Sequence, residues 1–299
     1  MAGPAPIPYD RPIDPPAGGL VVHFKIMALV AALSFGLLPI GAVHADLMPV
    51  DLELVMAVDV SGSVDVEEAR LQRDGYITAF RDPEVVRVIQ AGMLGRIAVL
   101  YTEWASAHEN RLVIDWHLIS DSASAAAFAD ALAAKPALRG RRTSIAAAIE
   151  FALPFFGTKY EGGRRVIDIS GDGPNNDGPP VVPARDAALS AGVVINGLPI
   201  LNEKQFVWGL PNLKELDVYF RDCVIGGPGS FYIVAEDFRT FAAAIKRKLV
   251  LEIAGRSPDR QYAQIYPERP MFLPDGSTDC LVGEKLLDIF QRRQRSMPY

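Results

Sequence analysis

The chain has 299 residues and a formal net charge of -6. Hydrophobic residues make up 49% of it and charged residues 22%, a globular composition that excludes disorder over most of its length. The acidic balance argues against a nucleic-acid partner, because such proteins carry a strongly basic surface. Two short basic clusters, Arg139-Gly140-Arg141-Arg142 and Lys246-Arg247-Lys248, are expected to be solvated loops or helix ends.

Residues 1–45 form a predicted N-terminal extension and signal peptide. An uncharged apolar run over residues 26–43 follows Lys25 and ends at Val43-His44-Ala45. The small residues at the two positions that a signal peptidase recognises predict cleavage after Ala45. The alternative is an uncleaved membrane anchor, but the run is near the lower length limit for crossing a bilayer. We therefore expect an exported protein, periplasmic or secreted, with no membrane span in its mature form.

Residues 50–254 are predicted to form one domain of alternating strands and helices. Short apolar runs that end in polar turns predict strands at 52–58, 96–102, 111–119, 165–170, 193–199 and 231–235. Helical spacing, capping residues and alanine-rich composition predict helices at 66–80, 122–134, 143–155, 182–191 and 237–253. The first of these helices has a plausible capping pair in Asp65 and Glu68.

This alternation predicts an α/β fold with a doubly wound, mainly parallel central sheet and helices on both faces. After Gly255 the periodicity fades. Residues 255–299 are therefore expected to form a loosely packed C-terminal tail.

The chain has two cysteines, Cys223 and Cys280. In an oxidising compartment they could form a disulfide, or both could remain unpaired, because the sequence does not place them within bonding distance. No Cys/His cluster has the spacing of a zinc site. Two of the four histidines, His23 and His44, lie in the targeting region, which argues against a histidine-based metal or hydrolase site.

Two of the predicted strands end in acidic turns. The first turn is Asp59-Val60-Ser61-Gly62-Ser63 and the second is Ser170-Gly171-Asp172-Gly173. In a parallel doubly wound sheet, ligands bind at the carboxyl ends of the strands, so both turns and the loop carrying Thr143 are expected to meet there. The candidate metal ligands are Asp59, Ser61, Ser63, Thr143 and Asp172. Their hard oxygen donors suit Mg²⁺ best, with Mn²⁺ or Ca²⁺ possible, and disfavour zinc or copper.

Each candidate ligand also has a structural explanation when it is taken alone. Asp59 and Ser61 could cap the following helix, and Asp172 could simply form a turn. The segment 175–177 just beyond Asp172 could support the site, contact a partner or again form a turn. Only the complete set favours a metal.

The pattern Asp59-x-Ser61-x-Ser63, with Thr143 and Asp172 later in the chain, resembles the metal-ion-dependent adhesion site of von Willebrand factor A domains. The resemblance covers about residues 50–254. The long loop after Ser170 and the segment Cys-Val-Ile-Gly-Gly-Pro-Gly further resemble a bacterial exported subfamily without an established activity. The resemblance implies a Rossmann-like fold and a metal that these five residues ligate directly or through water. It also implies an open coordination position that takes an Asp or Glu carboxylate from a partner protein.

The expected function is therefore an exported, metal-dependent protein-binding module and not an enzyme. One alternative is a metal-dependent hydrolase or phosphatase, because two aspartates and a cation could activate water. Against it, the sequence has no second metal cluster, no plausible general-base histidine and no Gly-x-Ser-x-Gly elbow. The other alternative is a structural or assembly role in which the metal only stabilises the loops.

Overall fold

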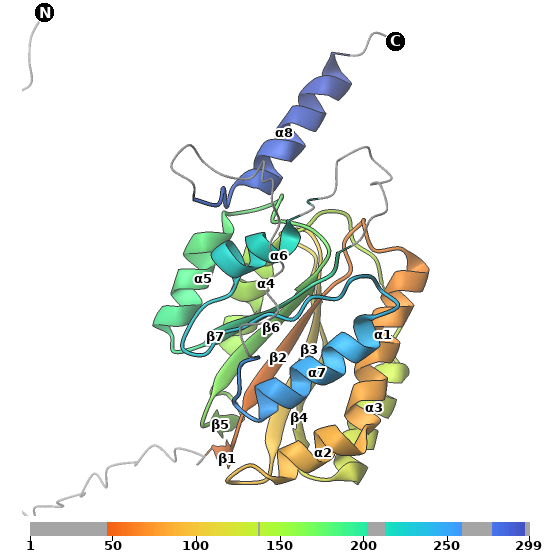
Figure 1. Ribbon diagram of the computed structural model, residues 1–299, viewed down its shortest axis with the longest axis vertical. Helices are drawn as coiled ribbons and strands as arrows, with labels where there is room; N and C mark the ends of the chain where they lie inside the picture. Colours follow the sequence, from red (N-terminus) through yellow and green to blue (C-terminus); the bar gives the residue numbers. More distant parts are fainter. Residues whose placement is uncertain (1–46, 137, 202–212, 214, 259–276, 297–299) are drawn as a thin grey trace, which may run out of the picture. The chain divides into compact units, whose positions relative to one another are not determined.

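The computed structural model describes residues 47–136, 138–201, 213, 215–258 and 277–296. The predicted signal peptide, with its cleavage site after Ala45, lies outside these residues. The described chain is built on a five-stranded sheet in the order β4-β3-β2-β6-β7 (Figure 1). The strands are β2 (Glu53–Asp59), β3 (Ile97–Trp104), β4 (Asn110–Ile119), β6 (Arg165–Gly171) and β7 (Val194–Pro199). β3 and β4 pair antiparallel, and the other three pairs are parallel.

Helices cover both faces of this sheet. One face packs against α1 (Val66–Arg81), α2 (Pro83–Gln90), α3 (Ser122–Ala133) and α7 (Phe241–Ile253). The other packs against α4 (Ile145–Ala152), α5 (Val181–Ser190), α6 (Leu216–Tyr219) and the π-helical turn η2 (Phe220–Val224). The predicted α/β fold, with a doubly wound, mainly parallel sheet and helices on both faces, is confirmed.

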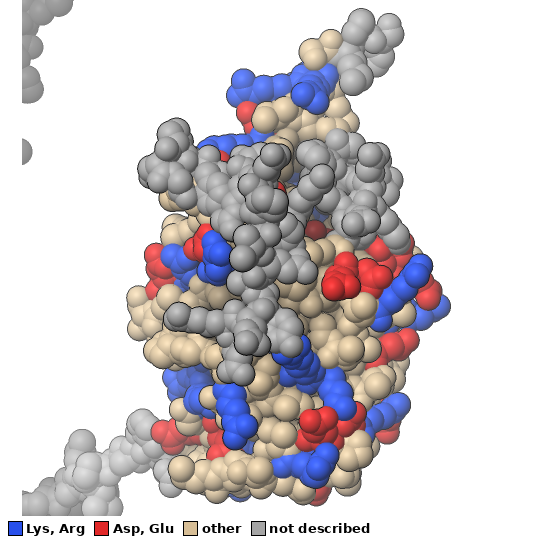
Figure 2. All heavy atoms as spheres, viewed as in Figure 1, with Lys and Arg blue, Asp and Glu red and all other residues tan. Residues whose placement is uncertain are grey.

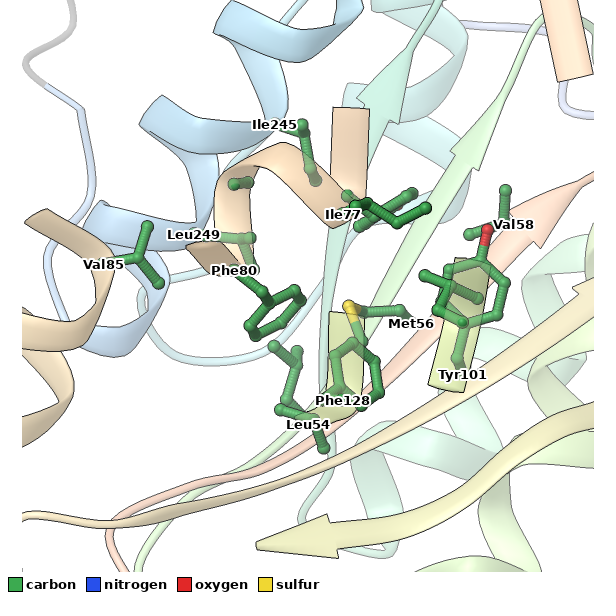
Figure 3. Packing of buried hydrophobic residues seen from close by; sticks show 14 of the residues in the cluster. Leu54, Met56, Val58, Ile77, Phe80, Val85, Tyr101, Phe128, Ile245 and Leu249 are labelled. Carbon is green, nitrogen blue, oxygen red and sulfur yellow. The ribbon is translucent and has the colours of Figure 1, made fainter. Parts of the chain in front are cut away.

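The central strand β2 explains why the sequence shows a nearly continuous apolar run. Leu54, Met56 and Val58 face the α1/α7 side of the sheet (Figure 3), while Val55 and Ala57 face the α4/α5 side. Since both faces are covered, alternating polar residues would be buried without partners. Burial of each large aliphatic side chain contributes about 2 kcal/mol, which fixes the register of β2 and therefore the position of the turn that follows it.

The structure differs from the sequence prediction in several elements. Residues 231–235 form no strand, because only Tyr232 and Ala235 make isolated bridges to the β7 region. The helix predicted from residue 237 begins at Phe241. The prediction missed α2, the small sheet of β1 (Met48–Val50) and β5 (Tyr160–Gly162), and a C-terminal helix α8 (Val282–Arg295). The capping box of Asp65 and Glu68 at the start of α1 is present as predicted.

Part of the prediction for the basic clusters is wrong. Lys248 is fully buried, because α7 turns it toward the sheet and not toward solvent. Arg139 is also engaged, since its guanidinium donates hydrogen bonds to the carbonyls of Val64 and Gly62. Figure 2 shows acidic and basic side chains interspersed over the viewed face of the described chain. None of the helices that the structure describes has the length and apolar character needed to cross a membrane.

A disulfide joins Cys223 in η2 to Cys280, two residues before α8. Gly283 is the one buried residue of α8, so the helix has little apolar contact with the domain. Its first turn rests on the loop after β6, where Glu284 accepts a hydrogen bond of 2.7 Å from Asn175. The disulfide is therefore the main attachment of the described C-terminal segment.

We expect Cys280→Ser to release this segment without unfolding the domain. Because α8 buries so little surface, loss of the disulfide should allow local opening, and trypsin should cut at its lysine and arginine residues about tenfold faster or more. Limited proteolysis followed by mass spectrometry measures this, with reduced wild type as the matched comparison. Equal cleavage rates in the variant and the oxidised wild type would show that noncovalent contacts hold α8.

Candidate metal centre

The two acidic turns lie side by side at one edge of the sheet. β2 and β6 are parallel neighbours with Val58 opposite Ser170, so both strands end at the same level. Asp59 is the last residue of β2, and Asp172 follows the last residue of β6. The pairing of these two strands thus places both carboxylates at the carboxyl edge, where ligands bind in such sheets.

The first turn curls back on its own aspartate. The backbone N–H of Ser61 donates to Asp59 Oδ1 at 2.7 Å, and the hydroxyl oxygens of Ser61 and Ser63 lie 3.0 Å apart. The Gln72 side chain donates to the Asp59 carbonyl at 3.1 Å, which ties the turn to α1. Asp59 and Ser61 are fully buried. The N-cap of α1 is Asp65, so capping of this helix does not account for Asp59 and Ser61.

Hydrogen bonds connect the first turn to the second. Ser63 Oγ donates to Asp172 Oδ1 at 2.5 Å, and the backbone N–H of Asp172 donates to Asp59 Oδ2 at 3.4 Å. Gly171 permits this approach, because a Cβ atom there would lie 3.1 Å from Asp59 Oδ2 and 3.3 Å from the ring of Trp104. The structure therefore brings Asp59, Ser61, Ser63 and Asp172 into one cluster.

Thr143 reaches the same place from the loop before α4. Its backbone N–H donates to Asn176 Oδ1 at 3.0 Å, and the N–H of Asn176 donates to the Thr143 carbonyl at 2.8 Å. The Thr143 side chain is buried, with Oγ1 3.8 Å from the position that a Cβ atom on Gly173 would take. On the other side, a Cβ atom on Gly62 would lie only 2.7 Å from the Arg141 carbonyl. The Thr143 loop therefore packs against both acidic turns.

The residues after Asp172 hold these loops together. Asn175 Oδ1 accepts the backbone N–H of Ala146 in the first turn of α4 at 3.1 Å, and Asp177 Oδ2 accepts that of Ala107 at 2.9 Å. With the Asn176–Thr143 pair, this assigns the segment a supporting role and not merely a turn. The two consecutive asparagines were a signal for it, because side-chain amides satisfy the backbone groups that loops leave unpaired.

The electrostatics of the cluster suit a cation. Burial raises the pKa of Asp59 well above its ordinary value, and the nearby Asp172 carboxylate raises it further. Two carboxylates that face each other in a buried place repel, and a divalent cation between them removes that repulsion. No group of three or more His, Cys, Asp or Glu side chains in the described residues is placed to hold a metal. The candidate set differs from such a group because hydroxyls supply its remaining donors, and these are the hard oxygens that Mg²⁺ accepts.

Comparison with known proteins begins with the sequence. The model of the family described as Protein of unknown function (DUF1194) matches residues 49–257. The chain belongs to this family. The sequence matches no curated protein.

Solved structures share the fold of this DUF1194 member. Proximal thread matrix protein 1 (PTMP1) from the mussel byssus aligns with a TM-score of 0.50 and 13% identity over 70% of this chain and 49% of its own. The open conformation of the pilus adhesin SpaC from Lactobacillus rhamnosus GG aligns with a TM-score of 0.51 and 15% identity, over 70% of this chain and 30% of its own. A von Willebrand factor type A structure from Catenulispora acidiphila aligns with a TM-score of 0.48 and 14% identity, over 69% of this chain and 43% of its own.

The present chain thus spans less than half the length of each of these proteins. The similarity to PTMP1 and SpaC, with TM-scores of 0.50 and 0.51, shows a shared fold and, at these identities, the fold alone.

We expect Asp59→Asn to stabilise the metal-free protein while removing its response to metal. The charged form of Asp59 costs stability at neutral pH because its pKa is raised, and asparagine keeps an Oδ1 acceptor for the Ser61 N–H. Relief of about 1 kcal/mol corresponds to a rise in Tm of about 2–4 °C in chelator-treated protein. Thermal melting with EDTA and then with Mg²⁺ measures both effects.

Asp115→Asn is the matched control for this experiment, because Asp115 is an exposed carboxylate on β4 that pairs with Lys159. The control should leave both the metal-free Tm and the Mg²⁺ response nearly unchanged. A lower metal-free Tm for Asp59→Asn, or a Mg²⁺ response equal to that of wild type, would count against a cation at this cluster.

Proposed function

We propose that this chain is an exported von Willebrand A-type module that binds a divalent cation and captures an Asp or Glu carboxylate of a partner protein. The cation, most favourably Mg²⁺ with Mn²⁺ or Ca²⁺ as alternatives, is held by Asp59, Ser61, Ser63, Thr143 and Asp172. The observation that carries the proposal is the hydrogen-bonded cluster of Asp59, Ser61, Ser63 and Asp172, which gathers hard oxygens at the carboxyl edge of the sheet.

The composition of the donor set supports capture of a carboxylate. The two aspartates supply the negative charge and the three hydroxyls are neutral, so a divalent cation held here keeps its attraction for one more anionic oxygen. The hydroxyls of Ser61 and Ser63 already lie against each other and against Asp172, which reduces the cost of organising them around an ion. A partner's Asp or Glu side chain supplies the hardest anionic oxygen that a protein surface offers.

The comparisons support binding over catalysis in general terms. SpaC is described as a pilus adhesin and PTMP1 as a matrix protein, and both share the fold at a TM-score of 0.50 or above. The Cys223–Cys280 disulfide supports an oxidising compartment, since such bonds persist mainly in exported proteins. Together with the apolar run ahead of Ala45, it favours the periplasm or the exterior as the place of action.

The partner interaction is expected to depend on the metal. Purified wild type, immobilised and loaded with Mg²⁺, should capture a partner from a periplasmic extract and release it with EDTA, because the metal supplies the contact to the partner's carboxylate. Asp172→Asn should lose about 1–3 kcal/mol of binding free energy, which is about fivefold to 150-fold in affinity, because it weakens metal binding. Quantitative pull-down followed by titration with the identified partner measures this.

Two controls sharpen this experiment. Asp115→Asn should capture the partner as wild type does, and the partner with its docking carboxylate changed to the amide should lose binding to wild type. Capture that persists in EDTA would contradict the proposal. Metal-dependent turnover of phosphate or carboxylic esters would instead favour the hydrolase alternative.

A further inference from the structure

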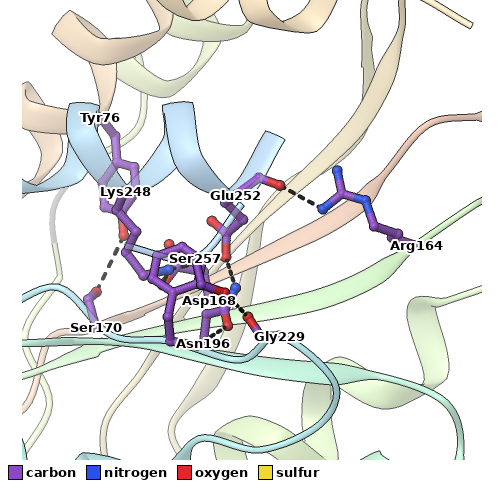
Figure 4. Close-up of polar contacts among 10 residues, drawn as sticks. Tyr76, Arg164, Asp168, Ser170, Asn196, Gly229, Lys248, Glu252 and Ser257 are labelled. Carbon is purple, nitrogen blue, oxygen red and sulfur yellow. Dashed lines mark hydrogen bonds and ion pairs between the residues drawn. The ribbon is translucent and has the colours of Figure 1, made fainter. Parts of the chain in front are cut away.

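A second polar cluster lies within the domain, away from the metal centre, and the proposed function does not use it. Asp168 lies in the middle of β6, and Asn196 is its register partner on β7. Lys248 and Glu252 lie one turn apart on α7 and point toward these strands (Figure 4). Lys248 and Asp168 are 0% exposed and Glu252 is 1% exposed. Four polar side chains thus meet between a helix and the sheet, where apolar residues are the rule.

The Lys248 amine contacts both carboxyl groups of this cluster, and it lies closer to Asp168 than to Glu252. Lys248 Nζ lies 2.5 Å from Asp168 Oδ1 and 3.2 Å from Glu252 Oε1. The contact with Asp168 does not have the angles of a hydrogen bond, and within the described residues neither oxygen of Asp168 accepts one. Glu252 Oε2 also accepts no hydrogen bond within the described residues, while Glu252 Oε1 accepts one of 2.6 Å from the Asn196 side chain. The amine is therefore in close ionic contact with Asp168, while it donates its hydrogen bond to Glu252.

The surroundings of the amine exclude water. The ring of Phe231 lies with its centre 5.4 Å from Lys248 Nζ, and the backbone N–H of Phe231 donates to Asn196 Oδ1 at 2.9 Å. Asn196 thus orients Glu252 through one end of its amide and fixes Phe231 through the other. Arg164 donates to the carbonyls of Glu252 and Ile253 at 2.7 Å each, which anchors the end of α7.

An ionised cluster is expensive in such a place. One ammonium and two carboxylates lose their hydration, and mutual attraction seldom repays that cost in a buried ion pair. Burial raises the pKa of Asp168 to about 7, against the lowering effect of Lys248. A substantial part of the Asp168 population is therefore a neutral carboxylic acid near pH 7, and an acid is a better electrophile than a carboxylate. A desolvated lysine amine is correspondingly a better nucleophile.

We propose that Lys248 Nζ and Asp168 Cγ form an intramolecular amide bond, with Glu252 as the proton carrier. The amine nitrogen already lies 2.5 Å from one oxygen of the carboxyl group, and holding the two groups together in this way lowers the entropic barrier to amide formation. Glu252 is placed to take a proton from Lys248 through Oε1, and the Asn196 amide holds it there.

The step is balanced without an oxidant or any other reactant. The step starts with all three groups charged. The ammonium of Lys248 gives a proton through Glu252 to the Asp168 carboxylate, and the free amine then attacks Cγ of the resulting neutral acid. One carbon–oxygen bond of the carboxyl group then breaks, and that oxygen leaves as water with protons that come from the lysine nitrogen through Glu252. The products are one amide and one water molecule. Glu252 returns to its starting state, and three buried charges become one.

The bond would tie α7, the last helix of the family-matched region, to the middle of the sheet. A module that holds a partner outside the cell is exposed to proteases and to pulling forces, and a covalent tie between its last helix and a central strand resists both. This consequence concerns the stability of the module and does not depend on the metal site.

Tryptic mapping of the purified full chain, reduced and alkylated, tests this proposal. If the amide forms, trypsin cannot cut after Lys248, and residues 166–185 and 248–256 appear as one branched peptide whose mass is the sum of the two minus one water. Fragmentation of that peptide places the link between Asp168 and Lys248. Separate peptides 166–185 and 249–256 as the dominant species, even after long incubation of the folded protein at neutral pH, would overturn the proposal and leave an ion pair.

Three variants separate the roles of the residues. Lys248→Met removes the nucleophile and should give only the linear peptide 166–185, as judged from the same digest. Glu252→Gln keeps the reacting pair but removes the proton carrier, so the branched peptide should be lost at a time when wild type is fully linked. Lys246→Met, on the exposed side of α7 where Lys246 pairs with Asp82 and Glu84, should link as wild type does. A fully linked Glu252→Gln would overturn the role of Glu252, and the wild-type digest remains decisive if a variant fails to fold.

Discussion

β2 and β6 pair in parallel in the middle of a sheet whose two faces are both covered by helices. This pairing fixes where the two strands end, and hence where Asp59 and Asp172 can lie. A slip of one residue in this pairing would turn every side chain of the slipped strand to the other face of the sheet, and it would misplace the two acidic turns relative to each other. The candidate metal centre is thus a consequence of strand register, and the loops only complete it.

The loops around the candidate metal centre meet through backbone contacts. These contacts require glycine where two segments approach closely and an asparagine amide where a backbone group needs a partner. Gly62 and Gly171 allow the turns to approach the Arg141 carbonyl and Asp59 Oδ2, and Asn176 joins the Thr143 loop to the segment after Asp172. These contacts leave both aspartates, Ser61 and Thr143 buried, and Ser63 half-buried beside Asp172. The cost of two facing carboxylates in the native state is what a cation removes, so the same feature that weakens the metal-free domain would strengthen metal binding.

Much of this arrangement follows from local sequence patterns. The apolar strands, the capping box at Asp65 and the acidic turns after β2 and β6 are each encoded within a few neighbouring residues, and the alternation of elements gives the parallel sheet. The five candidate ligands could be named for that reason, although the metal itself stays a prediction. The two consecutive asparagines indicated that this segment could support the site, but the partner of Asn176 could not be assigned, because the contact joins loops 33 residues apart.

The buried Lys248 cluster shows the other limit of sequence patterns. Lys248 sits in a run of three basic residues that would be solvated on most helices, and Asp168 interrupts an otherwise apolar strand. The contact between the two residues could not be predicted from the sequence, since 80 positions separate them and only the packing of α7 on β6 brings them together. Helix α8 was missed for a related reason, because its attachment depends on a disulfide and a glycine contact and not on an apolar face.

A crystal structure of the protein soaked in Mn²⁺, with anomalous diffraction data, tests the central claim most directly, because manganese accepts the same oxygen donors as magnesium and can be located by its own signal. The account predicts an anomalous peak enclosed by the oxygens of Asp59, Ser61, Ser63, Thr143 and Asp172, and its loss in Asp172→Asn. A fully soaked crystal with no peak at these residues, or with its only strong peak elsewhere, would contradict it.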